Sequence, residues 1–273
     1  MSINYKLKTK RLLQGNVIKL FFVKLTSLVL RYGSIFFCFA SIIYVVKSTF
    51  FNNLKKVYGT IPTSIAFYVL CAIAVSLCVL FFFGILSGEN MCFFERANGK
   101  PAGMKMLFSC MNAYTCTQAL FLYTKIFIYK ILWLLLFSTP CLACVFCLQF
   151  LISQNLVNVT LYYVLSGATS IVISLSLIMW RISILRYSVA PYVFCLDPQK
   201  NVSDAIMQSI NYTDNFLFEC LSNDLNLFFK HLGCIFILPI PYITAYTKIH
   251  RVVFVTDVIA TDLKLLRLRQ NID

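Results

Sequence analysis

Long apolar stretches alternate with short polar ones along the first two thirds of the chain. Residues 17–46, 63–88, 119–150 and 156–187 are each mostly apolar, and residues 63–88 carry no charge. A helix needs about 20 mostly apolar residues to cross the hydrocarbon core of a bilayer. Because each stretch exceeds that length, the pattern predicts four membrane-spanning helices.

The last third of the chain repeats this pattern less cleanly. Residues 216–232 are apolar but interrupted by charged and amide side chains, and residues 233–254 are apolar with two prolines. Lys and Arg favour the cytoplasmic side of a membrane, and two further crossings would return the basic C-terminal residues to the side of the basic N-terminal ones. The sequence therefore predicts an all-α polytopic bundle of about six membrane-embedded helices (five or six). Short interfacial helices accompany the bundle, and both termini are expected to be cytoplasmic.

The polar side chains of residues 216–232 leave two interpretations open. Glu219, Asp224 and Lys230 are costly in hydrocarbon. A spanning or re-entrant helix would have to turn them towards other helices or water, which would suit an ion or proton path. The same pattern fits an amphipathic helix at the membrane surface, with these groups in water, and we favour this second interpretation.

The composition agrees with a membrane protein. Of the 273 residues, 60% are hydrophobic and 12% are charged, whereas about a quarter of the residues in a soluble protein are charged. The net charge is +14. The basic residues flank the apolar stretches, which favours the lipid bilayer and its anionic headgroups as partners over nucleic acid.

The charge pattern divides the chain into three parts. We expect a basic amphipathic N-terminal segment (1–16), a membrane domain (17–254) and a basic cytoplasmic tail (255–273). The first segment fits an interfacial helix, and a disordered basic tail is the alternative.

We identify no catalytic, cofactor or metal site in the sequence. The most conspicuous motif is Cys141, Cys144 and Cys147, whose spacing resembles part of an iron–sulfur run. Steps of three residues spread these thiols over one broad face of a helix, so we interpret them as small packing residues. His231 and His250 have no metal ligand at a suitable spacing. We therefore expect a protein that is not an enzyme and uses no cofactor.

A polar break follows the fourth apolar stretch. Asp197 and Pro198 are expected to end the preceding helix, because proline disfavours a helical conformation in the residue before it. Asn201 is placed to cap a new helix. The apolar side chains that follow it at helical spacing are Val202, Ala205, Ile206 and Ile210. We expect a short amphipathic helix at the cytoplasmic surface.

The same segment resembles a known family. The sequence "YSVAPYVFCLDP" followed by "DAIMQS" is similar to the signature of domain of unknown function 975, a bacterial family of multi-pass membrane proteins. The stretches "KLKTKRLLQGN" and "LPIPYITAY" are similar to the opening basic helix and the closing Pro-Tyr helix of that family. The matching residues are Tyr187, Ser188, Ala190, Pro191, Tyr192, Asp197, Pro198, Ala205, Ile206, Ser209, Pro241 and Tyr242.

The resemblance implies a six-helix architecture and supplies no catalytic residues, because the family has no established activity. We expect a non-enzymatic integral protein of a bacterial cytoplasmic membrane that serves as a scaffold, assembly or envelope-associated component. The alternative is a small transporter or channel that uses the polar helix at residues 216–232.

Overall fold

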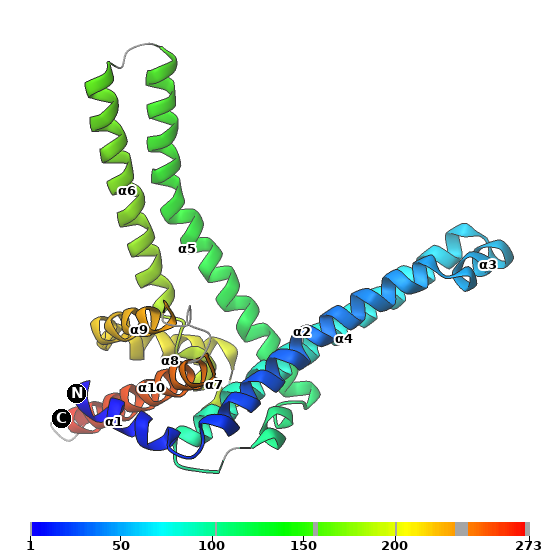
Figure 1. Cartoon of the computed structure of the whole chain (residues 1–273), viewed down its shortest axis with the longest axis horizontal. Coiled ribbons are helices and arrows are strands. Elements are labelled where there is room, and N and C mark those ends of the chain that lie inside the picture. The colour runs from blue at the N-terminus through cyan, green and yellow to red at the C-terminus, as the bar shows by residue number, and fades with distance from the viewer. Residues whose placement is uncertain (1, 102, 155–157, 200, 233–239, 271–273) are drawn as a thin grey trace.

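Two long helical hairpins rise from a layer formed by the other helices (Figure 1). The computed structural model describes the whole chain except residues 1, 102, 155–157, 200, 233–239 and 271–273, and the described residues contain helices and no strands. The all-α prediction is confirmed. We call the layer outside the two hairpins the basal layer, and the far end of each hairpin its tip.

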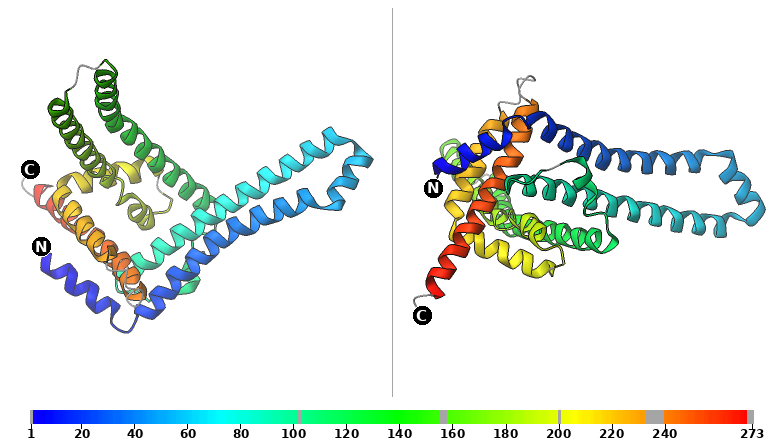
Figure 2. Two further views of the ribbon diagram at one scale, coloured as in Figure 1. Left: turned by 45° about the horizontal axis from the view of Figure 1, so that its top comes forward. Right: turned by 90° about the horizontal axis from the view of Figure 1, so that it is seen from below.

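The first hairpin consists of α2 (Val17–Lys47), α3 (Thr49–Tyr58) and α4 (Thr60–Ala97). The helices α2 and α4 pack side by side, and the short α3 forms the tip (Figures 1 and 2). Gly59 joins α3 to α4 with a φ of 86°, a conformation that glycine adopts without steric cost. The chain can therefore turn back sharply at the tip.

The second hairpin consists of α5 (Ala113–Ser153) and α6 (Val159–Leu185). The side chain of Asn158 caps α6 by accepting a hydrogen bond from the backbone N–H of Leu161 at 2.9 Å. Near the basal layer, Trp180 Nε1 donates to the carbonyl oxygen of Lys130 at 3.3 Å. A capping bond therefore fixes the start of α6 at the tip, and a hydrogen bond joins α6 to α5 near the basal layer.

The two hairpins meet near the basal layer and diverge towards their tips (Figure 1). In the most apolar 18-residue window of α2 and of α5, no residue is buried inside the protein. Apolar surface of this extent is rare on a soluble protein. The exposed faces of the hairpins are therefore suited to hydrocarbon rather than water.

The basal layer carries both terminal helices. Its elements are α1 (Ser2–Leu13), the 3-10 helix η1 (Met104–Phe108), α7 (Ala190–Leu196), α8 (Val202–Asn215), α9 (Leu217–Leu232) and α10 (Ile240–Gln270). The helix α1 packs along α10, and Lys8 Nζ lies 3.3 Å from Asp257 Oδ1. Thr9 and Leu13 of α1 are buried, so the N-terminal segment is a docked helix and not a disordered tail.

The short helix α7 is the centre of the hydrophobic core. Val189, Tyr192 and Val193 belong to a cluster with α1, α4 and α10. Ala190 and Phe194 belong to a second cluster with α5 and α8. Because α7 contributes to both clusters, it joins the base of the first hairpin to the base of the second.

The structure corrects the predicted number of spans. Four helices are long and apolar enough to cross a membrane among the described residues, and they match the four clear apolar stretches. The six-helix prediction fails at α9 and α10. The helix α9 has 16 residues and an acidic first turn, and it would extend only about 24 Å at 1.5 Å per residue. The helix α10 carries charged side chains along its length and contributes its apolar face to the basal core.

The predicted domain boundary at residues 254 and 255 falls within α10, and Val255 and Val258 are buried in the basal core. The first part of the predicted tail is therefore part of the folded layer.

Candidate functional site

A cluster of charged and polar side chains is buried where the first hairpin meets the basal layer. We call it the Glu89 junction, and it consists of Ser27 and Arg31 from α2, Glu89 and Asn90 from α4, and Lys248 from α10. Glu89 is 2% exposed. A buried carboxylate is costly unless partners compensate for its lost hydration, so its contacts determine whether this site is stable.

Three donors converge on the Glu89 carboxylate. Ser27 Oγ donates to Glu89 Oε2 at 2.7 Å, and Arg31 Nη2 donates to the same oxygen at 2.9 Å. Lys248 Nζ lies 3.3 Å from the other oxygen, Oε1. Both carboxylate oxygens are therefore engaged, and the contacts tie α2, α4 and α10 together.

Asn90 extends the junction to the second hairpin. Lys248 Nζ donates to Asn90 Oδ1 at 2.6 Å, and Asn90 Nδ2 donates to Tyr123 Oη at 2.6 Å. Tyr123 lies on α5, and its ring stacks on Phe83 of α4 with centroids 5.4 Å apart. The polar network therefore reaches from α2 through α4 to α5, at the point where the hairpins diverge.

The junction contains more positive than negative charge. Lys24 reaches the carbonyl oxygen of Thr244 at 3.5 Å, and it adds a third cation to Arg31 and Lys248 around the one carboxylate. Burial alone would lower the pKa of Lys248, but the neighbouring Tyr192 and Glu89 outweigh burial and raise it. Lys248 therefore remains charged, and Glu89 is needed to balance the buried cations.

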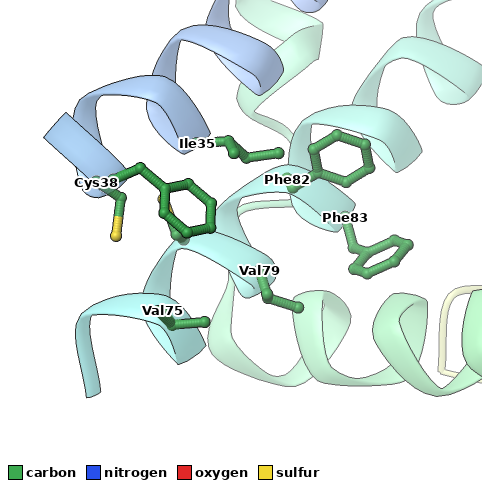
Figure 3. Close-up of a pocket in the computed structure, with 8 residues that line it drawn as sticks. Ile35, Cys38, Val75, Val79, Phe82 and Phe83 are labelled. Carbon is green, nitrogen blue, oxygen red and sulfur yellow. The ribbon is translucent and has the colours of Figure 1, made fainter. Parts of the chain in front are cut away.

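An apolar pocket adjoins the junction on the tip side. Figure 3 shows it between α2 and α4, with Ile35 and Cys38 on one helix and Val79 and Phe82 on the other. Its cavity volume is about 300 Å³. The guanidinium carbon of Arg31 lies 5.5 Å from the centroid of the Phe82 ring. Arg31 therefore lies where the polar junction gives way to the apolar hairpin.

A second ionic site joins α9 to its neighbours. Asp224 of α9 pairs with Arg181 of α6, and its other oxygen lies 2.9 Å from Nη2 of Arg251 on α10. Glu219 is exposed on the same helix, while the side chain of Lys230 lies outside the described residues. The predicted trio of Glu219, Asp224 and Lys230 is therefore not shown to form one cluster, and Asp224 docks α9 in the basal layer.

The residues of the predicted family signature lie in and around α7. The stop at Asp197 is confirmed, because α7 ends at Leu196 and Asp197 accepts a hydrogen bond from the backbone of Gln199 at 3.1 Å. Asn201 caps α8 as predicted, accepting from the backbone N–H of Ser203 at 3.2 Å. The segment thus forms the expected turn into an amphipathic helix, with Pro198 half-buried in it.

Two signature side chains connect the hairpin to the basal layer. Trp133 Nε1 of α5 donates to Tyr187 Oη at 3.0 Å, and the Tyr187 ring stacks on Tyr129 at 5.3 Å. Ser209 Oγ of α8 donates to the carbonyl oxygen of Arg186 at 2.6 Å. The buried members of the signature are Tyr187, Ala190, Tyr192, Ala205, Ile206 and Ser209. Ser188 and Pro191 are half-buried at the start of α7.

Other sequence candidates contribute little to either site. Cys141, Cys144 and Cys147 lie in the tip half of α5, where Cys147 is exposed. Among the described residues, no group of three or more His, Cys, Asp or Glu side chains is arranged to hold a metal ion. Pro241 and Tyr242 fall in α10, but their side chains lie outside the described residues.

The Glu89 junction was not predicted from the sequence. The first apolar stretch, residues 17–46, includes Lys24 and Arg31, and the second stretch ends one residue before Glu89. A signal was present, because Glu89 and Glu95 are the only acidic residues before Asp197. A rare acid directly after an uncharged span, in a chain with excess basic residues, points to a buried ionic partner.

The junction is suited to holding helices together. The carboxylate oxygens of Glu89 and the amide of Asn90 are all engaged by other side chains. No protein family model, curated protein or solved structure matches this chain. The resemblance to domain of unknown function 975 stays a prediction from the residues.

Proposed function

We propose that the protein is a non-enzymatic multi-pass scaffold of a bacterial cytoplasmic membrane. In this proposal the two hairpins cross the bilayer, and the basal layer lies on its cytoplasmic face with both termini. The observation that carries the proposal is the contrast between the two parts. The hairpins expose apolar surface and diverge towards their tips, whereas the basal layer contains the buried core.

Charged residues support this placement in the bilayer. From Arg31 to Lys47 along α2 the chain is uncharged, and the same holds from Lys130 to the end of α5 at Ser153. At 1.5 Å per residue these segments extend about 24 Å and about 35 Å. The hydrocarbon core of a bilayer is about 30 Å thick, so the α5 segment is long enough to cross it with some tilt. The α2 segment is about 6 Å shorter than this core, and its crossing would include Arg31, whose charge is paired with Glu89.

The distribution of basic residues supports the orientation. Only Lys47, Lys55 and Lys56 lie at the tip of the first hairpin, and the connection between α5 and α6 has no basic residue. Lys200 lies outside the described residues. All other basic residues belong to the basal layer or its connections, or to the basal halves of the hairpin helices. The positive-inside rule therefore favours a cytoplasmic basal layer.

The position of Asp224 favours a scaffold over the alternative of a transporter or channel. A transport path through the bilayer would need polar groups between packed spans. Asp224 instead pairs with Arg181 of α6 and Arg251 of α10, and the hairpins diverge above the basal layer. Asp224, one of the three residues that motivated the transport interpretation, therefore has a docking role in this proposal.

Reconstitution into liposomes tests the proposal. The protein should resist extraction by alkaline carbonate, as an integral protein does, and it should leave ion and solute permeability at the level of empty liposomes. A specific flux that the Asp224→Asn variant abolishes, while Asp257→Asn retains it, would contradict the proposal and restore the transport alternative.

Photo-crosslinking tests the scaffold role directly. Met207 of α8 is 63% exposed on the basal layer, so a photoreactive amino acid there should give a discrete protein adduct in native membranes. The matched control is Val164 of α6, which is 63% exposed on a hairpin and should give mainly lipid adducts. No protein adduct from Met207 or from other exposed basal positions would contradict a scaffold.

A further inference from the structure

A groove runs along the tip half of the first hairpin. It lies between α2 and α4, and its cavity volume is about 610 Å³. Its lining includes Phe37, Ile42 and Val45 on α2 and Phe67, Leu70 and Ala74 on α4. It shares Cys38 and Cys78 with the smaller pocket of Figure 3, so the two spaces adjoin.

We propose that this groove binds one acyl chain of an anionic phospholipid from the tip-side leaflet, with its phosphate near Lys47 and Lys56. This inference rests on the proposed membrane placement of the hairpins. It adds a specific lipid site to that placement, because the groove differs from the remaining hairpin surface in shape and in the charge at its outer end.

The length of the groove matches one leaflet. On α2 its lining extends from Ser34 to Val45, which is about 16 Å at 1.5 Å per residue. Half of the hydrocarbon core is about 15 Å. A chain lying in the groove would therefore reach from the middle of the bilayer to the headgroup region of the tip-side leaflet.

The width of the groove favours a single chain over a helix of a second copy. A volume of about 610 Å³ over this length gives a mean cross-section of about 38 Å², whereas a helix with its side chains is about 10–12 Å across. A neighbouring helix could lie over the groove without entering it. An extended acyl chain is narrow enough to lie inside.

The charge at the outer end fits a phosphate. Val45 lines the groove, and Lys47 follows two residues later at the end of α2. Lys47 and Lys56 are exposed, and residues 32–88 contain no Asp or Glu. Basic side chains at the membrane surface attract anionic lipids, so the tip should select an anionic headgroup over a zwitterionic one.

Lipid retention measured by native mass spectrometry tests the inference. Protein reconstituted into nanodiscs of equal phosphatidylglycerol and phosphatidylcholine is released and its bound lipid is identified. The wild type should retain one lipid, with a preference for phosphatidylglycerol of about tenfold. The Ala74→Phe variant fills the groove and should lose the bound lipid, while Ala66→Phe on the same helix outside the groove lining should retain it.

The headgroup contact has a separate test. Replacing both Lys47 and Lys56 with Gln should remove the preference for phosphatidylglycerol without removing the bound lipid, and Lys105→Gln in the basal layer should leave the preference unchanged. Retention by Ala74→Phe equal to wild type, or a wild type without lipid preference, would overturn the inference. The inference would also be overturned if the wild type formed a dimer without bound lipid and the Ala74→Phe variant were a monomer. Carbonate extraction of the same samples reports on membrane integration separately, so failure of the groove and failure of the proposed function are distinguishable.

Discussion

Replacing Glu89 with Gln should destabilise the protein strongly, because it removes the carboxylate that pairs with both Arg31 and Lys248. The side chain of Glu89 is 3% exposed, and those of Arg31 and Lys248 are 12% and 18% exposed. Loss of one member of a buried ion pair costs about 3–5 kcal/mol, since the remaining charges stay desolvated without a partner. Gln keeps the shape of the side chain and isolates the loss of charge.

Thermal unfolding in detergent measures this effect. For a chain of this size, about 1 kcal/mol shifts the Tm by about 2–4 °C, so the Glu89→Gln variant should unfold roughly 6–12 °C or more below wild type. The matched control is Asp257→Asn, whose ion pair with Lys8 is 39% and 45% exposed. An exposed pair contributes about 0–1 kcal/mol, so this variant should change the Tm by only a few degrees.

A double variant tests the proposed cause. If the unpaired cations destabilise Glu89→Gln, adding Lys248→Met should restore part of the lost Tm, because contacting residues have coupling energies of about 0.5–3 kcal/mol. Two outcomes would refute the reasoning. One is a Glu89→Gln variant with the same Tm as the Asp257→Asn control. The other is a double variant whose loss of Tm equals the sum of the losses of the two single variants.

Three further predictions concern packing, docking and thiol reactivity. An added Cβ at Gly88 would lie 2.0 Å from the carbonyl oxygen of Leu107, so Gly88→Ala should lower the free energy of unfolding by about 1–3 kcal/mol. The control Gly167→Ala has open space around the added Cβ and should be neutral or stabilising by up to about 1 kcal/mol. Equal Tm values for the two variants would show that α4 and η1 are not in contact. The Asp224→Asn variant leaves two arginines without their carboxylate, and limited proteolysis should cleave α9 faster than in wild type, while unchanged cleavage would remove its docking role. Burial raises the pKa of the Cys220 thiol to about 12, with smaller contributions from nearby acids. Alkylation of Cys220 at pH 8 should therefore be far slower in folded than in unfolded protein, and its rate in folded protein should rise about tenfold per pH unit. Equal alkylation rates in folded and unfolded protein at pH 8 would contradict the burial of Cys220.

The hairpins were predictable because their signal is local. Each clear apolar stretch coincides with one long helix, and the cap at Asn201 and the stop at Asp197 depend only on neighbouring residues. Length and polarity determine whether a helix can cross a bilayer, so these features can be read without knowledge of tertiary contacts.

The basal layer was not predictable to the same degree, because its side chains are explained by distant partners. Asp224 is paired with residues from α6 and α10, and Glu89 with residues 58 to 159 positions away. The charge pattern correctly placed the two terminal helices at one end of the molecule, but it also favoured two crossings at α9 and α10. Four and six crossings both return the chain to its starting side, so that pattern cannot distinguish them.

Cysteine accessibility tests the central claim, that two hairpins cross the membrane and α9 stays in the basal layer. Asn53 lies in α3 at a tip, Asn98 follows α4 at the base and Ser222 lies in α9, and all three are exposed. Labelling of the native thiols in wild type is subtracted from the labelling of each variant. Asn53→Cys should then react with a membrane-impermeant maleimide in intact cells. Asn98→Cys and Ser222→Cys should react only in inside-out vesicles. Labelling of Ser222→Cys in intact cells, or of Asn53→Cys and Asn98→Cys from the same side, would contradict the account.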